Sequence, residues 1–262
     1  MALGTGCLPH TNLCDPATDG YTEDCVDTAA GGKADKADTG EPAVTEAELV
    51  NYFAIDAEAA HGMVLFDAKL WVADWESSFI VALSPEDGTA SGDTLDIGAH
   101  NPVDLAHDGS EIWILTQGGD LLEFYEEEPT ERASLSAAEG IAFDGEYICA
   151  ASTSEVYRVR DNGSTIFSTP ISGPGGPLGF LEGRFVQATS EGSGGQITLK
   201  LFDAESRVSS LFLDEVSVDV ADNPNTPITG IAIGTDHVYL LIGSTGSHGA
   251  SVLTVSLPSD WL

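Results

Sequence analysis

The strongest constraint on this chain is a pattern of three short apolar runs that recurs five times. In its clearest copy, the run 140–143 is followed by an Asp-Gly turn, the run 148–151 and the alternating run 155–160. An Asp-Gly pair between two apolar runs is typical of a β-hairpin, and alternation is typical of a strand with one buried face. Each copy therefore predicts three antiparallel strands joined by tight turns.

The spacing of the copies predicts how these strands are assembled. The copies begin at residues 62, 104, 140, 177 and 230, and β-propeller blades repeat about every 40–50 residues. Fourth strands are expected at 94–97, 132–135, 164–167 and 208–212. The fifth copy shows no fourth strand, and we expect the upstream run 48–55 to supply it and close the ring.

The predicted fold class is therefore all-β: a five-bladed β-propeller of four-stranded antiparallel blades. A two-sheet sandwich built from the same hairpins is the alternative, and the internal repetition favours the propeller. Small residues start several first strands, among them Gly62, Gly140 and Gly230. Such residues suit the crowded axis of a propeller. Asp104 replaces the small residue in the second copy, which suggests a carboxylate at the channel mouth.

The repeated hairpin, in which an apolar residue precedes Asp-Gly and an apolar or aromatic residue follows, resembles that of the NHL-like and YWTD-like propeller families. The resemblance covers about residues 48–262, and Leu70-Trp-Val-Ala-Asp74 is the nearest match to a Tyr-Trp-Thr-Asp signature. Members of these families serve as binding platforms, as scaffolds and sometimes as enzymes. The resemblance therefore implies a fold and leaves the function open.

The charge of the chain excludes some classes of partner. Nine basic residues against 43 acidic ones give a net charge of −34. Nucleic acids and anionic membrane surfaces are bound through clustered Lys and Arg, so we expect neither partner. The acidic residues are spread along the chain, which favours a generally solvated surface over a calcium site or a cationic partner. No apolar run is long enough to be a transmembrane segment.

Residues 1–44 are predicted to be a disordered acidic leader and tether, and residues 45–262 the propeller. Cys7 follows Leu3-Gly-Thr-Gly6 and resembles the lipid-modified cysteine of a bacterial surface lipoprotein; Cys14 and Cys25 would then form a disulfide. The alternative is three reduced cysteines in a flexible tail. Cys149 is expected to be a buried core residue. The leader indicates an extracellular or bacterial cell-surface protein. A lipid anchor at Cys7 is compatible with this location but is not required for it.

Two groups of residues are candidate metal ligands. Asp15 and Asp19 stand at the first and fifth places of a calcium loop, although Ala17 and Val26 stand where further ligands belong. A solvated acidic loop is the alternative. Asp104 forms the second group with two histidines from adjacent blades, which could be ligands as neutral imidazoles or ordinary loop residues.

Ligands of a propeller usually meet the face formed by the inter-blade loops and the loops between second and third strands. The candidate ligand-binding residues on this face are Trp75, Asp74, His61, His100, Asn101, Glu139 and His248. The two histidines of the second metal group are His61 and His100. Trp75 would be a platform for a sugar or peptide, because binding hot spots often use Trp; it could equally cap the packing between blades.

Enzymatic motifs are absent from the sequence: there is no Gly-x-Ser-x-Gly elbow, no His-Glu-x-x-His and no phosphate loop. We therefore expect a non-enzymatic, secreted or cell-surface monomer that binds a protein or glycan partner through its loop-rich face. The alternative is a calcium-dependent, lactonase-like hydrolase, for which Asp104, Glu139 and Asn101 are the plausible residues. A scaffold without a ligand is the third hypothesis.

Overall fold

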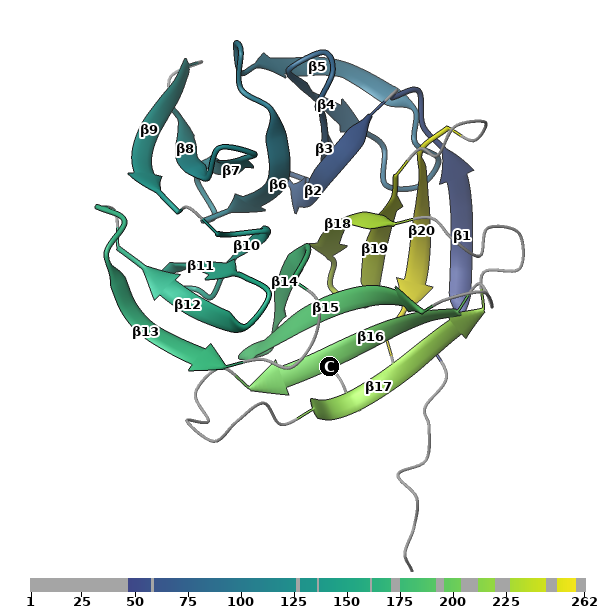
Figure 1. Cartoon of the computed structure of the whole chain (residues 1–262). Coiled ribbons are helices and arrows are strands. Elements are labelled where there is room, and N and C mark those ends of the chain that lie inside the picture. Colours follow the sequence, from purple (N-terminus) through teal and green to yellow (C-terminus); the bar gives the residue numbers. More distant parts are fainter. Residues whose placement is uncertain are drawn as a thin grey trace, which may run out of the picture. The chain divides into compact units, whose positions relative to one another are not determined.

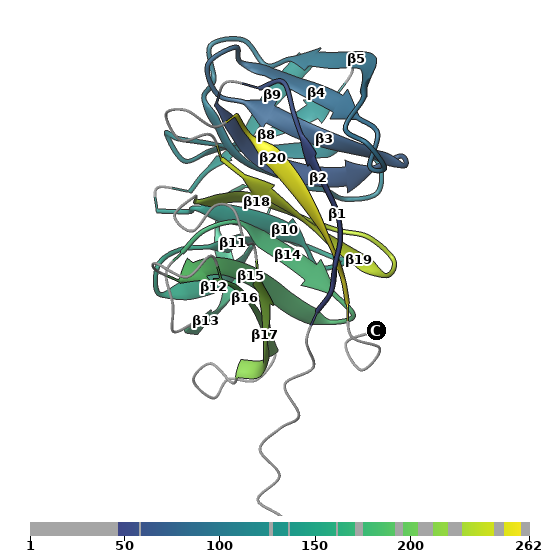
Figure 2. The same ribbon diagram turned by 90° about the vertical axis from the view of Figure 1, so that its right-hand side faces the viewer.

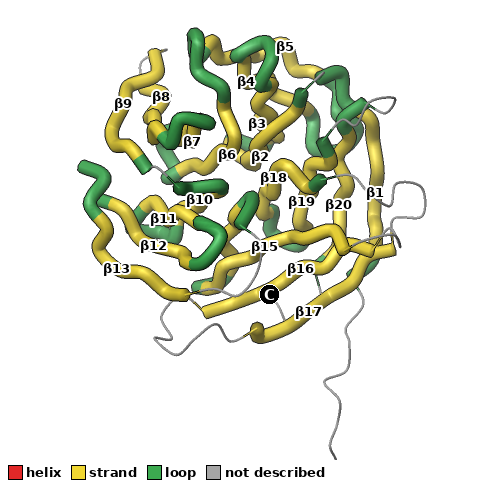
Figure 3. Tube along the Cα trace, viewed as in Figure 1, coloured by secondary structure: helices red, strands yellow, loops and turns green. Residues whose placement is uncertain are grey.

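The computed structural model describes the strands and loops of residues 47–57, 59–125, 128–135, 137–160, 162–170, 175–191, 196–203, 212–219, 227–243 and 249–257. The chain divides into two units, and all of these residues belong to the second, Ala43–Leu262. They form five four-stranded antiparallel sheets around a central axis, the blades of a β-propeller (Figure 1). No helix occurs among them (Figure 3), and hence none that could cross a membrane. The predicted fold class is confirmed.

In the first four blades the strands follow one another outward, so that the first strand in sequence lies beside the axis (Figure 1). The first blade contains β2 (Ala60–Phe66), β3 (Lys69–Asp74), β4 (Phe79–Leu83) and β5 (Ala90–Asp96). The second contains β6 (Pro102–His107), β7 (Ile112–Thr116), β8 (Asp120–Tyr125) and β9 (Glu128–Ser134). The third contains β10 (Gly140–Phe143), β11 (Ile148–Ala151), β12 (Glu155–Val159) and β13 (Thr165–Pro170). The fourth contains β14 (Leu178–Leu181), β15 (Arg184–Glu191), β16 (Gln196–Asp203) and β17 (Phe212–Asp219).

The fifth blade joins the two ends of the propeller sequence. It contains β18 (Ile228–Ile233), β19 (His237–Ile242) and β20 (Ser251–Ser256), and its outermost strand is β1 (Leu49–Ala54). β1 runs antiparallel to β20, with Tyr52 opposite Leu253 (Figure 2). The prediction that the run 48–55 completes the last blade is therefore confirmed.

The fourth strand of the fourth blade was predicted at 208–212. Of that run only Phe212 is described, and it is the first residue of β17 (Phe212–Asp219); residues 208–211 lie outside the described residues. The alternation from 214 to 218 is what pairs with β16, since Val216 and Val218 lie opposite Leu199 and Ile197.

The hydrophobic core lies between neighbouring blades, as expected for a propeller. Trp71 packs between the first and second blades and Trp113 between the second and third, and both are buried. Each indole N–H has an acceptor: Trp71 donates to the carbonyl of Phe66, and Trp113 to the carboxylate of Asp108. Buried indoles need such acceptors. Cys149 is also fully buried, as predicted.

Close approach of the innermost strands explains the glycines of the repeat. A Cβ on Gly62 would lie 2.6 Å from the Cα of Asp104, and one on Gly140 would lie 2.1 Å from the carbonyl oxygen of Gly176. Gly230 abuts the backbone of β2 in the same way. A side chain at any of these positions would therefore force two blades apart.

Asp104 occupies the equivalent position in the second blade and makes a different contact. Its side chain is fully buried, and Oδ2 accepts hydrogen bonds from the N–H groups of Ile141 (2.8 Å) and Leu178 (3.4 Å). One carboxylate thus links the innermost strands of three blades, β6, β10 and β14. The expected position at an open channel mouth was wrong, because the neighbouring strands come close enough to enclose the carboxylate. Burial raises the pKa of Asp104 well above its usual range, and the amide donors oppose this rise.

The closing strand should contribute strongly to stability through Phe53. Its side chain is buried in a cluster with Leu83 and Val252, and its ring lies over Gly88 of the first blade. We expect Phe53→Ala to lower the free energy of unfolding by about 3–5 kcal/mol. Tyr52→Ala is the matched control, because Tyr52 is 57% exposed, and should cost less than about 0.5 kcal/mol. Urea unfolding followed by circular dichroism measures both; equal losses would contradict the role of Phe53.

The carboxyl of Asp104 should make stability depend on pH. Its pKa is raised in the folded protein, so its contribution is full below the pKa of the unfolded chain, about 3.9. The contribution is then lost as the pH rises through the folded-state pKa. Asp104→Asn keeps an acceptor oxygen and cannot ionise. The difference in unfolding free energy, wild type minus Asp104→Asn, should therefore fall as the pH rises above about 4. Urea unfolding of both proteins at several pH values tests this prediction. If the two unfolding free energies change in parallel with pH, the pKa of Asp104 is not raised.

Candidate functional site

The innermost strands of the blades all begin at the same end of the channel. There the structure has an open cavity of about 400 Å³, here called the mouth cavity. Every blade contributes to its lining, which includes His61, Val103, Gln117, Glu139, Pro177 and Thr229. The loop-rich face predicted from sequence therefore carries a cavity on the axis.

His61 and Trp75 form an aromatic pair beside the mouth cavity. Their ring centroids are 4.8 Å apart in an edge-to-face arrangement, which typically contributes about 0.5–1.5 kcal/mol. The main-chain N–H of Trp75 donates to the carbonyl of Ala59 (3.0 Å), and this bond holds the β3–β4 turn against the start of β2. Half-burial lowers the pKa of His61, so its imidazole is neutral at pH 7. Trp75 is half-buried and contacts His61 instead of lining the cavity.

Glu139 and Gln117 bring exposed polar groups to the mouth cavity. The N–H of Glu139 donates to the carbonyl of Ala151 (2.7 Å), and the N–H of Gln117 donates to that of Asn101 (2.8 Å). A Cβ on Gly175 would lie 1.9 Å from Oε2 of Glu139, so the glycine makes room for this carboxylate. Main-chain hydrogen bonds thus fix the backbone of both residues, while their side chains remain exposed.

Thr229 and the charge pattern complete the chemistry of the mouth cavity. The hydroxyl of Thr229 donates to the carbonyl of Ala60 (2.9 Å), which ties the fifth blade to the first, and its oxygen lone pairs remain acceptors. The described lining contains one carboxylate, Glu139, and neither Lys nor Arg. The cavity is therefore suited to hydroxyl groups and to cations, and it disfavours anions.

The other predicted ligand-binding residues lie outside this cavity. Asp74 is half-buried, and its Oδ1 accepts from the N–H of Glu76 (3.1 Å), a bond within its own turn. Asn101 contributes its main-chain carbonyl to the position of Gln117, and His100 lies next to it without lining the cavity. His248 lies outside the described residues.

The predicted metal ligands are only partly placed. His61 lines the mouth cavity, whereas the buried carboxylate of Asp104 accepts hydrogen bonds from main-chain amides. His100 does not line the cavity. In the part of the chain that the structure describes, no three His, Cys, Asp or Glu side chains are grouped so that they could hold a metal ion. Asp15 and Asp19, with Cys7, Cys14 and Cys25, lie outside the described residues, so those predictions remain untested.

Several lining residues are absent from the predicted set, and a simple signal in the sequence marks two of them. Val103 directly precedes Asp104, and Thr229 directly precedes Gly230. His61 and Glu139 stand in the same relation to Gly62 and Gly140. The residue before the small residue of each repeat therefore faces the mouth in four blades. Applying this rule to the aligned copies would have found both residues.

Comparison with known proteins supports the fold. The sequence matches no protein-family model and no curated protein sequence. The crystal structure of Myxococcus xanthus glutaminyl cyclase is similar, with a TM-score of 0.61 and 14% identity over 81% of this chain and 97% of that one. The PQQ-bound aldose sugar dehydrogenase of Streptomyces coelicolor has a TM-score of 0.55 and 10% identity over 80% of this chain and 98% of that one. At these identities the likeness shows the propeller fold alone.

Proposed function

We propose that this propeller binds a protein or glycan partner through its loop-rich face, with one polar group of the partner entering the mouth cavity. The observation that carries the proposal is a cavity of about 400 Å³ to which all five blades contribute. Ligand pockets typically have volumes of about 300–1,000 Å³. A single sugar unit or one long side chain is therefore of suitable size.

The chemistry of the lining supports the same class of ligand. Glu139 offers acceptor oxygens, Gln117 offers both a donor and an acceptor, and His61 is a neutral imidazole. Sugar hydroxyls need this mixture, and the ammonium or guanidinium group of a protein would pair with Glu139. The net charge of −34 would speed the approach of a cationic partner.

Binding is favoured over catalysis by the contacts of the lining residues. Nucleophilic catalysis needs a nucleophile hydrogen-bonded to a base. Among the described lining residues, the Thr229 hydroxyl donates instead to a main-chain carbonyl. A calcium-dependent hydrolase remains the alternative; it would need the carboxylate of Asp104 to leave its two amide donors.

An extracellular or bacterial cell-surface location is part of this proposal. It is supported by the sequence before Cys7, by Cys14 and Cys25, and by the acidic, small-residue segment that follows them. That the chain belongs to the NHL-like or YWTD-like propellers is likewise part of the proposal, and the repeated hairpins of the sequence support it.

Binding should depend on the carboxylate of Glu139. We would screen the full chain against a glycan array and a positional peptide library. For the probes retained, we expect Glu139→Gln to weaken binding about tenfold or more, because a hydrogen bond to a charged group contributes about 1.5–3 kcal/mol. Glu146→Gln is the matched control: it removes an exposed carboxylate from the β10–β11 turn of the same blade, at the other end of β10. Equal affinities of all three proteins for every probe would contradict the proposal.

Calcium separates the proposed function from its alternative. If the propeller is a binding protein without a metal site, the thermal midpoint of the full chain should be the same in calcium and in chelator at fixed ionic strength. A ligand that binds only the folded state raises the midpoint. A rise that disappears in Asp104→Asn would instead favour the hydrolase.

A further inference from the structure

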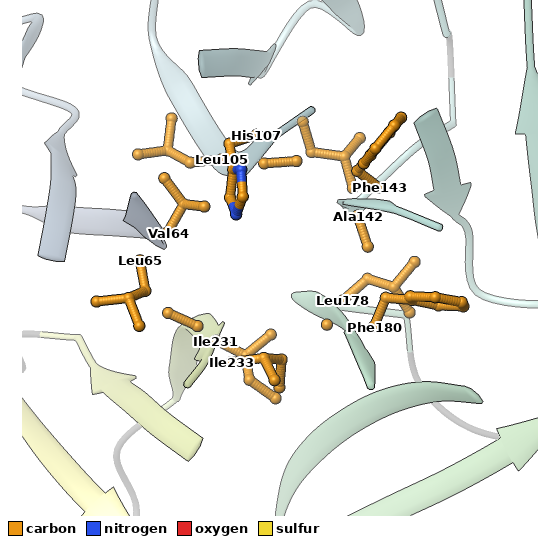
Figure 4. A pocket seen from close by; sticks show the side chains of 14 residues that line it. Val64, Leu65, Leu105, His107, Ala142, Phe143, Leu178, Phe180, Ile231 and Ile233 are labelled. Atoms are coloured by element: carbon orange, nitrogen blue, oxygen red, sulfur yellow. The ribbon is translucent and has the colours of Figure 1, made fainter. Parts of the chain in front are cut away.

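A second cavity lies at the other end of the channel and shares no lining residue with the mouth cavity. This basal cavity has a volume of about 140 Å³, and its most prominent lining residues are Leu65, His107, Phe143, Phe180 and Ile233 (Figure 4). It is lined mostly by residues from the middle to the end of the innermost strands, whereas the mouth cavity is lined mostly by residues at or just before the starts of these strands. Along β6, Val103 lines the mouth cavity, Asp104 is buried, and Leu105 lines the basal cavity.

The side chains of the basal cavity are apolar with one exception. Thirteen of the fourteen lining residues are Val, Leu, Ile, Ala, Phe or Gly, and the fourteenth is His107. Main-chain groups also border the space, because the innermost strand of each blade has no neighbour on its axial side. The cavity therefore combines apolar side chains and main-chain polar groups with a single titratable side chain.

The hydrogen bonds of His107 define what this side chain offers. Its Nδ1 accepts a hydrogen bond from the N–H of Gly109 (3.1 Å), so the neutral ring carries its proton on Nε2. Phe66 packs against the same ring, with centroids 5.2 Å apart. Nε2 has no hydrogen-bond partner among the described residues, and Figure 4 shows the imidazole pointing into the open space of the cavity. Burial lowers the pKa of His107, which keeps the ring neutral at pH 7.

We propose that the basal cavity binds a small neutral molecule with an apolar ring or short chain and one carbonyl-type oxygen, which accepts a hydrogen bond from Nε2–H of His107. Size supports the assignment, since an engineered apolar cavity of about 150 Å³ binds benzene. Burying a donor without an acceptor is costly, so a ligand that supplies the oxygen is favoured over one that does not. A charged ligand would lose its hydration with no charged side chain to replace it.

The experiment compares two probes of nearly the same shape, cyclohexanone and methylenecyclohexane, which differ in the acceptor oxygen. Ligand-observed NMR on the full chain gives a dissociation constant for each. The measured quantity is the preference for cyclohexanone, expressed as the ratio of the two constants. We expect His107→Phe, which keeps an aromatic ring and removes the donor, to reduce this preference about five- to tenfold, as loss of one neutral hydrogen bond predicts.

Two variants serve as controls. His237→Phe removes another half-buried histidine, at the start of β19, which does not line the basal cavity. Glu139→Gln changes only the mouth cavity. Both should leave the preference unchanged. If neither probe binds the wild type, or if His107→Phe leaves the preference as it was, the proposal is wrong.

A measurement on the wild type covers the case in which His107→Phe does not fold. The ¹⁵N shift of Nε2 of His107 should move on saturation with cyclohexanone and stay nearly constant with methylenecyclohexane. If this ¹⁵N shift changes equally with both probes, or with neither, the proposed hydrogen bond from His107 to the ligand is wrong.

Discussion

The architecture depends on how closely the innermost strands approach one another. With five blades the ring is narrow, and at Gly62, Gly140 and Gly230 even a methyl group would meet the backbone of the next blade. Hydrophobic packing between blades, around residues such as Trp71 and Trp113, acts further from the axis. The glycines provide no packing energy of their own; they allow the blades to come close enough for that packing to form.

Asp104 shows a second solution to the same constraint. Where three other blades use contact between backbones at a glycine, its carboxylate accepts hydrogen bonds from two strands across the axis. The unpaired axial edges of those strands need acceptors, and this side chain supplies them. Along β6 it lies between a residue of the mouth cavity and a residue of the basal cavity, and the two cavities differ in the side chains that line them.

Repetition in the sequence was sufficient to predict the blades, their number and the closing strand, because five aligned copies of one hairpin leave few alternatives. Side-chain positions near the axis were harder. Asp104 was expected at the channel mouth and is fully buried, since nothing in the sequence states how narrow a five-bladed channel is. Trp75 was considered as an exposed platform, but its ring packs against His61. The burial of Asp104 arises from distances between blades, which no single repeat encodes, whereas the contact of Trp75 with His61 lies within the first blade.

The register of the repeat separates framework from chemistry. In three blades the glycine at the start of the first strand is fixed by contact with the next blade, and in the second blade Asp104 takes its place. The residue just before this position faces the mouth cavity. In four blades that preceding residue is His61, Val103, Glu139 or Thr229: an imidazole, an aliphatic group, a carboxylate and a hydroxyl. Side chains here can differ in kind because none is needed to bring the blades together. The variety at these positions, beside uniformity at the glycines, is what a binding surface on a rigid repeat framework requires.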